Sequence, residues 1–152
     1  MAYYPDNFAH DRKPGQKAIV RVTYSRPEMK GREIFGKLVP YGKVWRTGAN
    51  EATEIKFYQE VELAGEKVKA GTYSLFTVPG EKEWTIILSS DLDYWGAFGY
   101  KQGNDVLRVT AHATETANAV ENFIIQFQST GENQGVMKLA WAKTVVEVPF
   151  KM

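Results

Sequence analysis

Residues 72–88 read TYSLFTVPGEKEWTIIL. The first half, residues 72–78, is rich in β-branched and aromatic side chains and stops at Pro79-Gly80, because proline cannot donate a hydrogen bond to a strand ladder. In the second half, residues 83–88, alternation in an extended chain places three apolar side chains on one face: Trp84, Ile86 and Leu88. The stretch therefore predicts a β-hairpin that turns at residues 79–82.

Alternation continues outside this hairpin. In residues 17–24, four side chains share one face, namely Ala18, Val20, Val22 and Tyr24. Ala64-Gly65-Glu66 predicts a second tight hairpin between residues 60–63 and 67–68. Further strands are expected at 54–58, 106–110, 121–128, 135–141 and 144–150. Residues 34–39 predict a short strand or a helical turn, and residues 112–122 a loop that can include a short helix.

These runs recur with turn residues between them, and none shows a convincing apolar repeat at helical spacing. The pattern predicts an all-β, single-domain antiparallel β-sandwich of about nine strands, jelly-roll or immunoglobulin-like, with at most a short helix. A length of 152 residues suits one domain, and 13% aromatic residues suit a β fold. We expect residues 1–16 to form an N-terminal extension and residues 17–152 to form the domain.

The composition of the chain excludes several kinds of functional site and partner. The chain has no cysteine, which excludes disulfides, thiolate metal sites and a cysteine nucleophile. No apolar run approaches about eighteen residues, so no transmembrane segment is expected. The net charge of +1 gives no global field to recruit nucleic acid, and no such partner is expected. The distribution is uneven, because residues 26–46 carry a net charge of +4 and residues 47–135 a net charge of −7.

The densest segment of polar and aromatic groups is residues 24–53. Arginine pairs with planar anions, tyrosine and tryptophan stack on sugar rings, and glycine lets a backbone approach a ligand. The functional interpretation is a pocket for an anionic or sugar-like ligand, lined by Tyr24, Arg26, Lys30, Arg32, Tyr41, Lys43, Trp45, Arg46, Asn50 and Glu51. The structural interpretation is an ordered loop whose charges pair internally, Arg26 with Glu51 and Arg46 with Glu54.

A second aromatic group lies in residues 94–100, YWGAFGY. We expect either an exposed platform made by Trp95, Phe98 and Tyr100 or a buried crossover in which the glycines give clearance. Catalysis has weaker support. Glu51 with Arg46 and Tyr41 could serve a hydrolase or lyase, but no matched second carboxylate, nucleophile motif or metal-ligand spacing accompanies them. We expect no cofactor and no metal.

Several motifs together resemble one family. They are VTYSRP at 22–27, KGR at 30–32, IFG at 34–36, LVPYGKVWRTGANEAT at 38–53, KAGTYSLFTVPG at 69–80, EWT at 83–85, WG at 95–96 and LAWxKTxVxVP at 139–149. This pattern is similar to the bacterial domain-of-unknown-function family 2911, over roughly residues 17–150. The resemblance implies a β-rich domain and export behind a leader, although residues 1–16 resemble no leader. It implies no activity, ligand or cofactor.

These observations support three hypotheses. The first is a non-catalytic binding or accessory module of the bacterial cell envelope for a small polar or anionic ligand, such as a glycan. The second is a structural or protein-interaction domain with a buried charged network, and the third is the hydrolase or lyase built on Glu51. A periplasmic or cell-surface location with the leader removed is expected by resemblance, with the cytoplasm as the alternative. The oligomeric state is left open.

Overall fold

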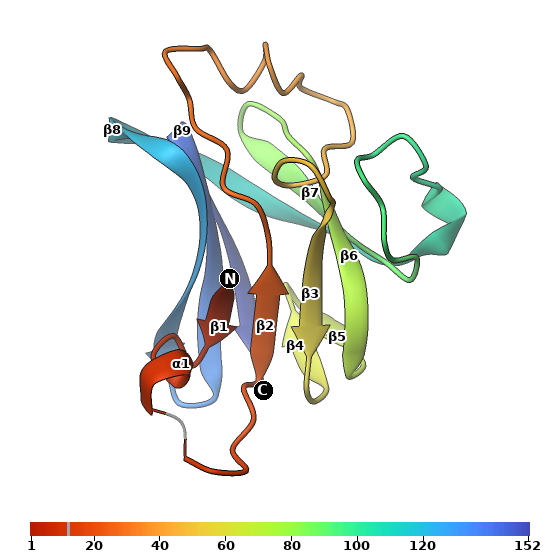
Figure 1. Cartoon of the computed structure of the whole chain (residues 1–152), viewed down its shortest axis with the longest axis vertical. Coiled ribbons are helices and arrows are strands. Elements are labelled where there is room, and N and C mark those ends of the chain that lie inside the picture. Colours follow the sequence, from red (N-terminus) through yellow and green to blue (C-terminus); the bar gives the residue numbers. More distant parts are fainter. Residues whose placement is uncertain (12) are drawn as a thin grey trace.

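The computed structural model describes residues 1–11 and 13–152. Nine antiparallel strands form one sheet in the order β1-β2-β3-β6-β7-β8-β9-β4-β5 (Figure 1). The strands are β1 Ala2–Tyr4, β2 Val20–Thr23, β3 Thr53–Phe57, β4 Val61–Leu63, β5 Glu66–Val68, β6 Gly71–Val78, β7 Glu83–Ser89, β8 Asp105–Gly131 and β9 Gln134–Lys151. A short helix α1 Phe8–Asp11 and a single 3-10 turn η1 Gln102–Asn104 complete the described elements.

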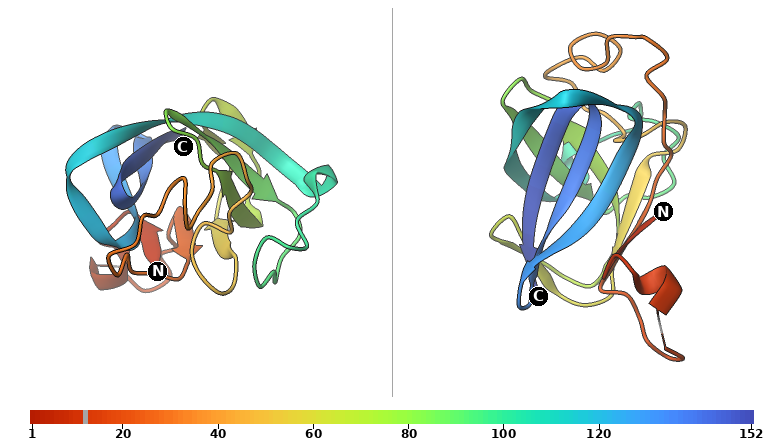
Figure 2. Two further views of the ribbon diagram at one scale, coloured as in Figure 1. Left: turned by 90° about the horizontal axis from the view of Figure 1, so that it is seen from above. Right: turned by 90° about the vertical axis from the view of Figure 1, so that its left-hand side faces the viewer.

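Strand β8 connects two layers of the fold. Its first part pairs with β7, from Asp105 opposite Ser89 to His112 opposite Glu83, and its later part pairs with β9. Register shifts after Glu115 and after Val120 mark the bend between the two parts. Figure 2 shows β8 arching over the molecule, so that β9 and the later part of β8 face the strands β1 to β3. The predicted all-β sandwich is therefore confirmed, with both layers belonging to one continuous sheet.

The prediction for residues 112–122 was wrong. This segment lies inside β8, where Ala113 and Thr114 stand opposite Val146 and Val145 of β9. Most of its side chains are exposed because the strand bends on the outside of the molecule. Its polar composition therefore reflects solvent on both sides of a curved strand rather than a loop, and cross-strand pairing overrides its helix-forming residues. The separately predicted strands 135–141 and 144–150 are likewise one strand, β9, with Ala142 at a φ of 53°.

Both predicted hairpins are confirmed. In the first, β6 pairs with β7 in the register Leu75 opposite Leu88 and Val78 opposite Thr85. In the second, Ala64 and Gly65 join β4 to β5 with φ angles of 48° and 89°, the positive pair that a type I′ turn requires. Residues 34–39 form a turn closed by an isolated bridge between Phe35 and Val39.

The first residues of the chain belong to the sheet. Ala2, Tyr3 and Tyr4 pair with Val22, Arg21 and Val20 of β2. The Tyr4 ring packs edge-on against Phe150 of β9, with ring centroids 4.9 Å apart. Part of the segment expected as an N-terminal extension therefore adds an edge strand and a core side chain.

Aromatic rings fill one end of the core between the layers. Trp45 stacks on Trp141 of β9, with centroids 6.0 Å apart and planes 14° apart, and meets Phe123 of β8 at 5.1 Å. Phe35 lies 4.9 Å from Trp84 of β7. Trp45 comes from the long connection between β2 and β3, which runs over the top of Figure 1. It is held by a two-way backbone bridge, in which Trp45 N donates to Thr77 O and Thr77 N donates to Trp45 O.

We predict that Trp45→Ala lowers the free energy of unfolding by about 3–5 kcal/mol, because it leaves a cavity among rings that cannot close around it. Trp95→Ala is the matched control and should change stability by no more than about 0.5 kcal/mol, since that side chain is 63% exposed. Urea denaturation followed by far-UV circular dichroism measures both. Equal stability losses in the two variants would contradict the assignment of Trp45 to the core.

Candidate functional site

The start of the connection between β2 and β3 makes hydrogen bonds to the edge of β8. The Tyr24 hydroxyl donates to Ile125 O at 3.2 Å and accepts from Ile125 N at 3.1 Å. Arg26 Nε donates to Phe123 O at 3.0 Å. The main chain continues the same contact, because Phe123 N donates to Pro27 O and Met29 N donates to Glu121 O. Two residues predicted to bind a ligand, Tyr24 and Arg26, thus direct polar atoms at the backbone of β8.

The other predicted basic residues are dispersed. Arg32 donates from Nε to Met29 O and from Nη2 to Glu28 O, which fixes its head group within its own turn. Lys30, Tyr41 and Lys43 are exposed, and so is Asn50, which has a φ of 60°. Neither predicted ion pair forms: in the described residues Arg26 makes no salt bridge with Glu51, and Arg46 makes none with Glu54.

Three buried threonines hold the turn that leads into β3. The Thr47 hydroxyl lies 3.0 Å from that of Thr77, and the Thr53 hydroxyl donates to Thr47 O at 2.6 Å. Thr53 N donates to Arg46 O, which closes residues 46–53 into a compact loop. This loop presents Glu51 to solvent and places Glu54 near the start of β3.

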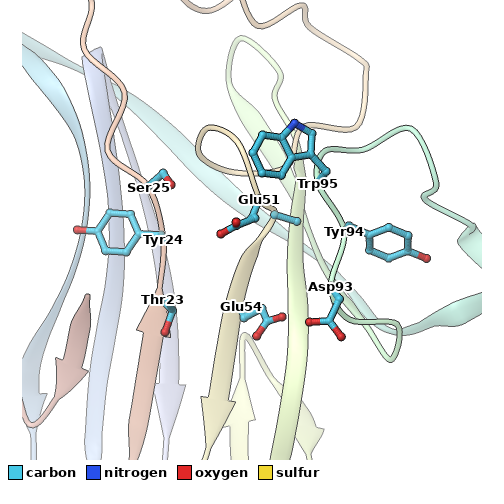
Figure 3. A pocket seen from close by; sticks show the side chains of 9 residues that line it. Thr23, Tyr24, Ser25, Glu51, Glu54, Asp93, Tyr94 and Trp95 are labelled. Atoms are coloured by element: carbon cyan, nitrogen blue, oxygen red, sulfur yellow. The ribbon is translucent and has the colours of Figure 1, made fainter.

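A cavity of about 480 Å³, called here the acidic cavity, lies beside this loop. Its walls come from the end of β2, the start of β3 and the loop after β7. Figure 3 shows the carboxylates of Glu54 and Asp93 facing each other, with Glu51 above them and the Trp95 ring above Glu51. The lining residues are Thr23, Tyr24, Ser25, Glu51, Ala52, Glu54, Asp93, Tyr94 and Trp95.

The chemistry of this cavity is that of hydrogen-bond acceptors. Glu51, Glu54 and Asp93 make no salt bridge within the described part of the chain. The hydroxyls of Thr23 and Ser25 add groups that both donate and accept. The rings of Tyr24 and Tyr94 point away from the cavity in opposite directions (Figure 3), so their hydroxyls serve other contacts. In residues 1–11 and 13–152, no three His, Asp or Glu side chains are grouped to hold a metal ion.

The loop that carries Trp95 is anchored on both sides of it. Tyr94 donates to Asp91 Oδ2 at 2.7 Å, and Tyr100 donates to the Asp105 carboxylate at 2.7 Å. Both rings pack on Phe76, with centroids 5.7 and 5.0 Å away. The hydrogen bond to Asp91 raises the pKa of Tyr94, and burial raises the pKa of Tyr100, so both phenols remain protonated donors at neutral pH.

Within the predicted platform, the three aromatic side chains therefore differ. Trp95 is 63% exposed and Phe98 is 99% exposed, whereas Tyr100 is a half-buried anchor. The anchors explain why two large rings can stand in solvent, because Tyr94 and Tyr100 fix the loop on the sheet from either end. Gly96 lies between the two exposed rings and is buried beside Arg46.

Of the predicted residues, Tyr24, Glu51 and Trp95 line the acidic cavity. Arg32, Trp45, Arg46 and Phe98 line a second cavity on the other side of the 46–53 loop. Glu51 and Arg46 thus line different cavities, and Tyr41 lines neither. The arrangement does not assemble the three groups of the hydrolase hypothesis around one space.

Sequence reasoning missed Glu54 and Asp93 as members of the site. The sequence indicates for Glu54 only a place in a strand and a pairing with Arg46, and Asp93 lies 39 positions farther along the chain. Strand alternation offered one signal for Glu54, because its neighbours Thr53 and Ile55 are fully buried and its own side chain must point outward. No comparable signal existed for Asp93.

We predict that Tyr24→Phe lowers the free energy of unfolding by about 1–3 kcal/mol, because Ile125 then keeps a backbone N–H and C=O without their partner. Tyr41→Phe is the control, since that exposed phenol makes no hydrogen bond in the described structure. Guanidinium unfolding curves of the two variants supply the measurement. If Tyr24→Phe is as stable as Tyr41→Phe, the hydroxyl does not hold the β8 edge.

No helix in the described residues is long and apolar enough to cross a membrane. No curated protein matches this chain, and no solved structure matches it. A family model described as a protein of unknown function, DUF2911, matches residues 6–150, nearly the whole chain. The resemblance seen in the sequence is thereby confirmed, and the chain belongs to the DUF2911 family of proteins of unknown function.

Proposed function

We propose that this protein is a non-catalytic binding module of the bacterial cell envelope and that it takes a neutral, polyhydroxylated ligand, a glycan, in the acidic cavity. One observation carries the proposal. The Trp95 ring, 63% exposed, lines a cavity whose three carboxylates form no salt bridge in the described chain. An exposed ring and free acceptors are the two groups with which proteins hold a sugar.

The ring and the carboxylates have separate roles. A sugar presents an apolar face of C–H groups, which packs on an indole, and a rim of hydroxyls, which donate to carboxylate oxygens. The carboxylates of Glu54 and Asp93 are turned toward each other (Figure 3), so neighbouring hydroxyls on one edge of a sugar can donate to both. Thr23 and Ser25 supply the remaining polar groups at the end of β2.

Charge selects against an anion at this position. Three carboxylates within one cavity repel a carboxylate or phosphate ligand, and the basic residues that would attract one lie elsewhere. The anionic ligand considered from the sequence is therefore not proposed for the acidic cavity. A neutral ligand is bound by hydrogen bonds and stacking without this repulsion.

The walls of the cavity are held before any ligand arrives. Ala52 N donates to Tyr94 O at 2.8 Å, which joins the start of β3 to the loop that carries Trp95. Glu54 stands on a strand paired on both sides, opposite Thr23 of β2 and Ser74 of β6. Such preorganisation lowers the conformational entropy that the protein must lose when a ligand binds. The envelope location rests on the family resemblance, which implies export.

We predict that Trp95→Ala and Glu54→Gln each weaken glycan affinity about fivefold or more, since the loss of stacking or of a charged acceptor costs about 1 kcal/mol or more. The control is Glu66→Gln, an exposed carboxylate on β5 that does not line the cavity. Binding is measured by isothermal calorimetry with neutral glucans, galactans and N-acetylglucosamine oligomers. Iodide quenching of tryptophan emission should fall when the wild-type protein is saturated.

Two results would overturn this proposal. If none of the oligosaccharides protects Trp95 from iodide, the acidic cavity is not a glycan site. The hypothesis of a structural or protein-interaction domain is then favoured. If an oligosaccharide binds and is cleaved, and Glu51→Gln abolishes cleavage while the fold is retained, the protein is an enzyme rather than a binding module. Equal binding by Trp95→Ala and wild type would remove the role given to the ring.

A further inference from the structure

The second cavity has a different chemistry and shares no residue with the first. Its volume is about 570 Å³, and we call it the basic cavity. Most of its wall is apolar, formed by Pro27, Leu38, Val39, Val44, Trp45, Ala97, Phe98 and Trp141. Phe98 is 99% exposed and Leu38 48% exposed, so apolar surface faces solvent at its rim. A volume within the range of about 300–1,000 Å³ suits a small ligand.

Two guanidinium groups belong to this apolar wall, those of Arg32 and Arg46. Among the described residues neither forms a salt bridge. Arg46 is half-buried, and within residues 1–11 and 13–152 its side chain makes one hydrogen bond, a long one from Nε to Gly48 O at 3.5 Å. Its two terminal nitrogens are therefore left with donors to offer. A half-buried cation beside apolar surface gains strongly from a carboxylate partner.

Arg32 is oriented by backbone acceptors. Its Nε and Nη2 donate to Met29 O and Glu28 O, which holds the planar head group at the rim and leaves Nη1 without a described partner. The Arg32 turn is itself fixed on β8, because Met29 N donates to Glu121 O. Both cations are thus held by the chain, one by its own turn and one by the 46–53 loop.

We propose that the basic cavity binds a small anionic amphiphile, a single carboxylate on an aliphatic body such as a fatty acid. The carboxylate pairs with Arg46, with Arg32 adding a second charge, and the aliphatic body covers Phe98, Leu38 and the edges of Trp45 and Trp141. The charge and the apolar wall each exclude an alternative. A cationic amphiphile is repelled by the guanidiniums, and a small inorganic anion leaves the apolar wall uncovered.

The test compares amphiphiles that share a tail and differ in head group. Dodecanoate, dodecyltrimethylammonium and dodecyl maltoside are titrated below their micellar concentrations into the wild-type protein, followed by calorimetry and by tryptophan emission. Dodecanoate is expected to bind at least tenfold more tightly than either of the others, and its affinity should fall as salt is added. This comparison needs no variant, so it stands even where a substitution harms folding.

Variants then locate the site. Arg46→Gln should weaken dodecanoate binding about tenfold or more, and Phe98→Ala should weaken it severalfold. Lys43→Gln is the control, an exposed cation of the same connection that does not line the cavity, and it should bind as wild type does. Trp95→Ala should also leave dodecanoate binding unchanged, which separates failure of this proposal from failure of the glycan site.

Three outcomes overturn the proposal. The first is equal affinity for all three head groups, which indicates nonspecific apolar adsorption. The second is an unchanged dodecanoate affinity in folded Arg46→Gln. The third is binding to vesicles of anionic phospholipid without any binding of monomeric dodecanoate, which identifies the exposed Phe98 and Leu38 as part of a membrane-surface contact instead.

Discussion

The edge of β8 between Glu121 and Ile125 is the constraint on which the rest of the structure depends. β9 pairs with one edge of β8. The bend in β8 leaves the backbone N–H and C=O groups of its other edge in need of hydrogen-bond partners. The chain supplies them from residues 24–29, through the Tyr24 hydroxyl, the Arg26 guanidinium and main-chain bonds to Pro27 and Met29. The first role of the polar and aromatic segment 24–53 is thus structural, because its start closes the sheet over the core.

Fixing that segment positions the next part of the chain. Trp45 enters the core next to Trp141 and Phe123 and bridges to Thr77 of β6. The 46–53 loop is then held at both ends, and it separates the two cavities. Glu51 faces the acidic cavity on one side, and Arg46 faces the basic cavity on the other. Both cavities form because the connection between β2 and β3 is held against the sheet. Residues close in sequence therefore line cavities of opposite charge.

The chain has a net charge of only +1, yet its acidic and basic groups are separated in the structure. Carboxylates and guanidiniums in adjacent loops could have neutralised one another, as the sequence alone suggested for Arg46 and Glu54. The structure keeps them apart: among the described residues, the three carboxylates of one cavity and the two guanidiniums of the other make no salt bridge. Unpaired like charges held together by a rigid scaffold lower stability, and such groups concentrate where proteins bind ligands.

The fold was predictable where local signals agreed. Alternation and the Pro79-Gly80 stop located the β6–β7 hairpin, and Ala64-Gly65 located the second turn. The prediction for residues 112–122 failed because a strand exposed on both faces has no alternation of apolar and polar side chains to detect. The site was predictable only in part. An aromatic residue in a glycine-rich segment can face core or solvent, so Trp45 and Trp95 looked alike, although one is 9% and the other 63% exposed. Asp93 and Glu54 meet only through the packing of distant segments, which no spacing encodes.

Native-state hydrogen exchange, read amide by amide, tests the closure most directly. The amides of Phe123 and Ile125, which donate to Pro27 O and to the Tyr24 hydroxyl, should exchange only through global unfolding, with the same free energy as the amides of the β6–β7 hairpin. The Trp45 and Thr77 amides should do the same. Exchange of these four amides through a smaller opening, in which the amides that bond β6 to β7 stay protected, would contradict the account, since residues 24–53 would then be a detachable loop rather than the closure of the sheet.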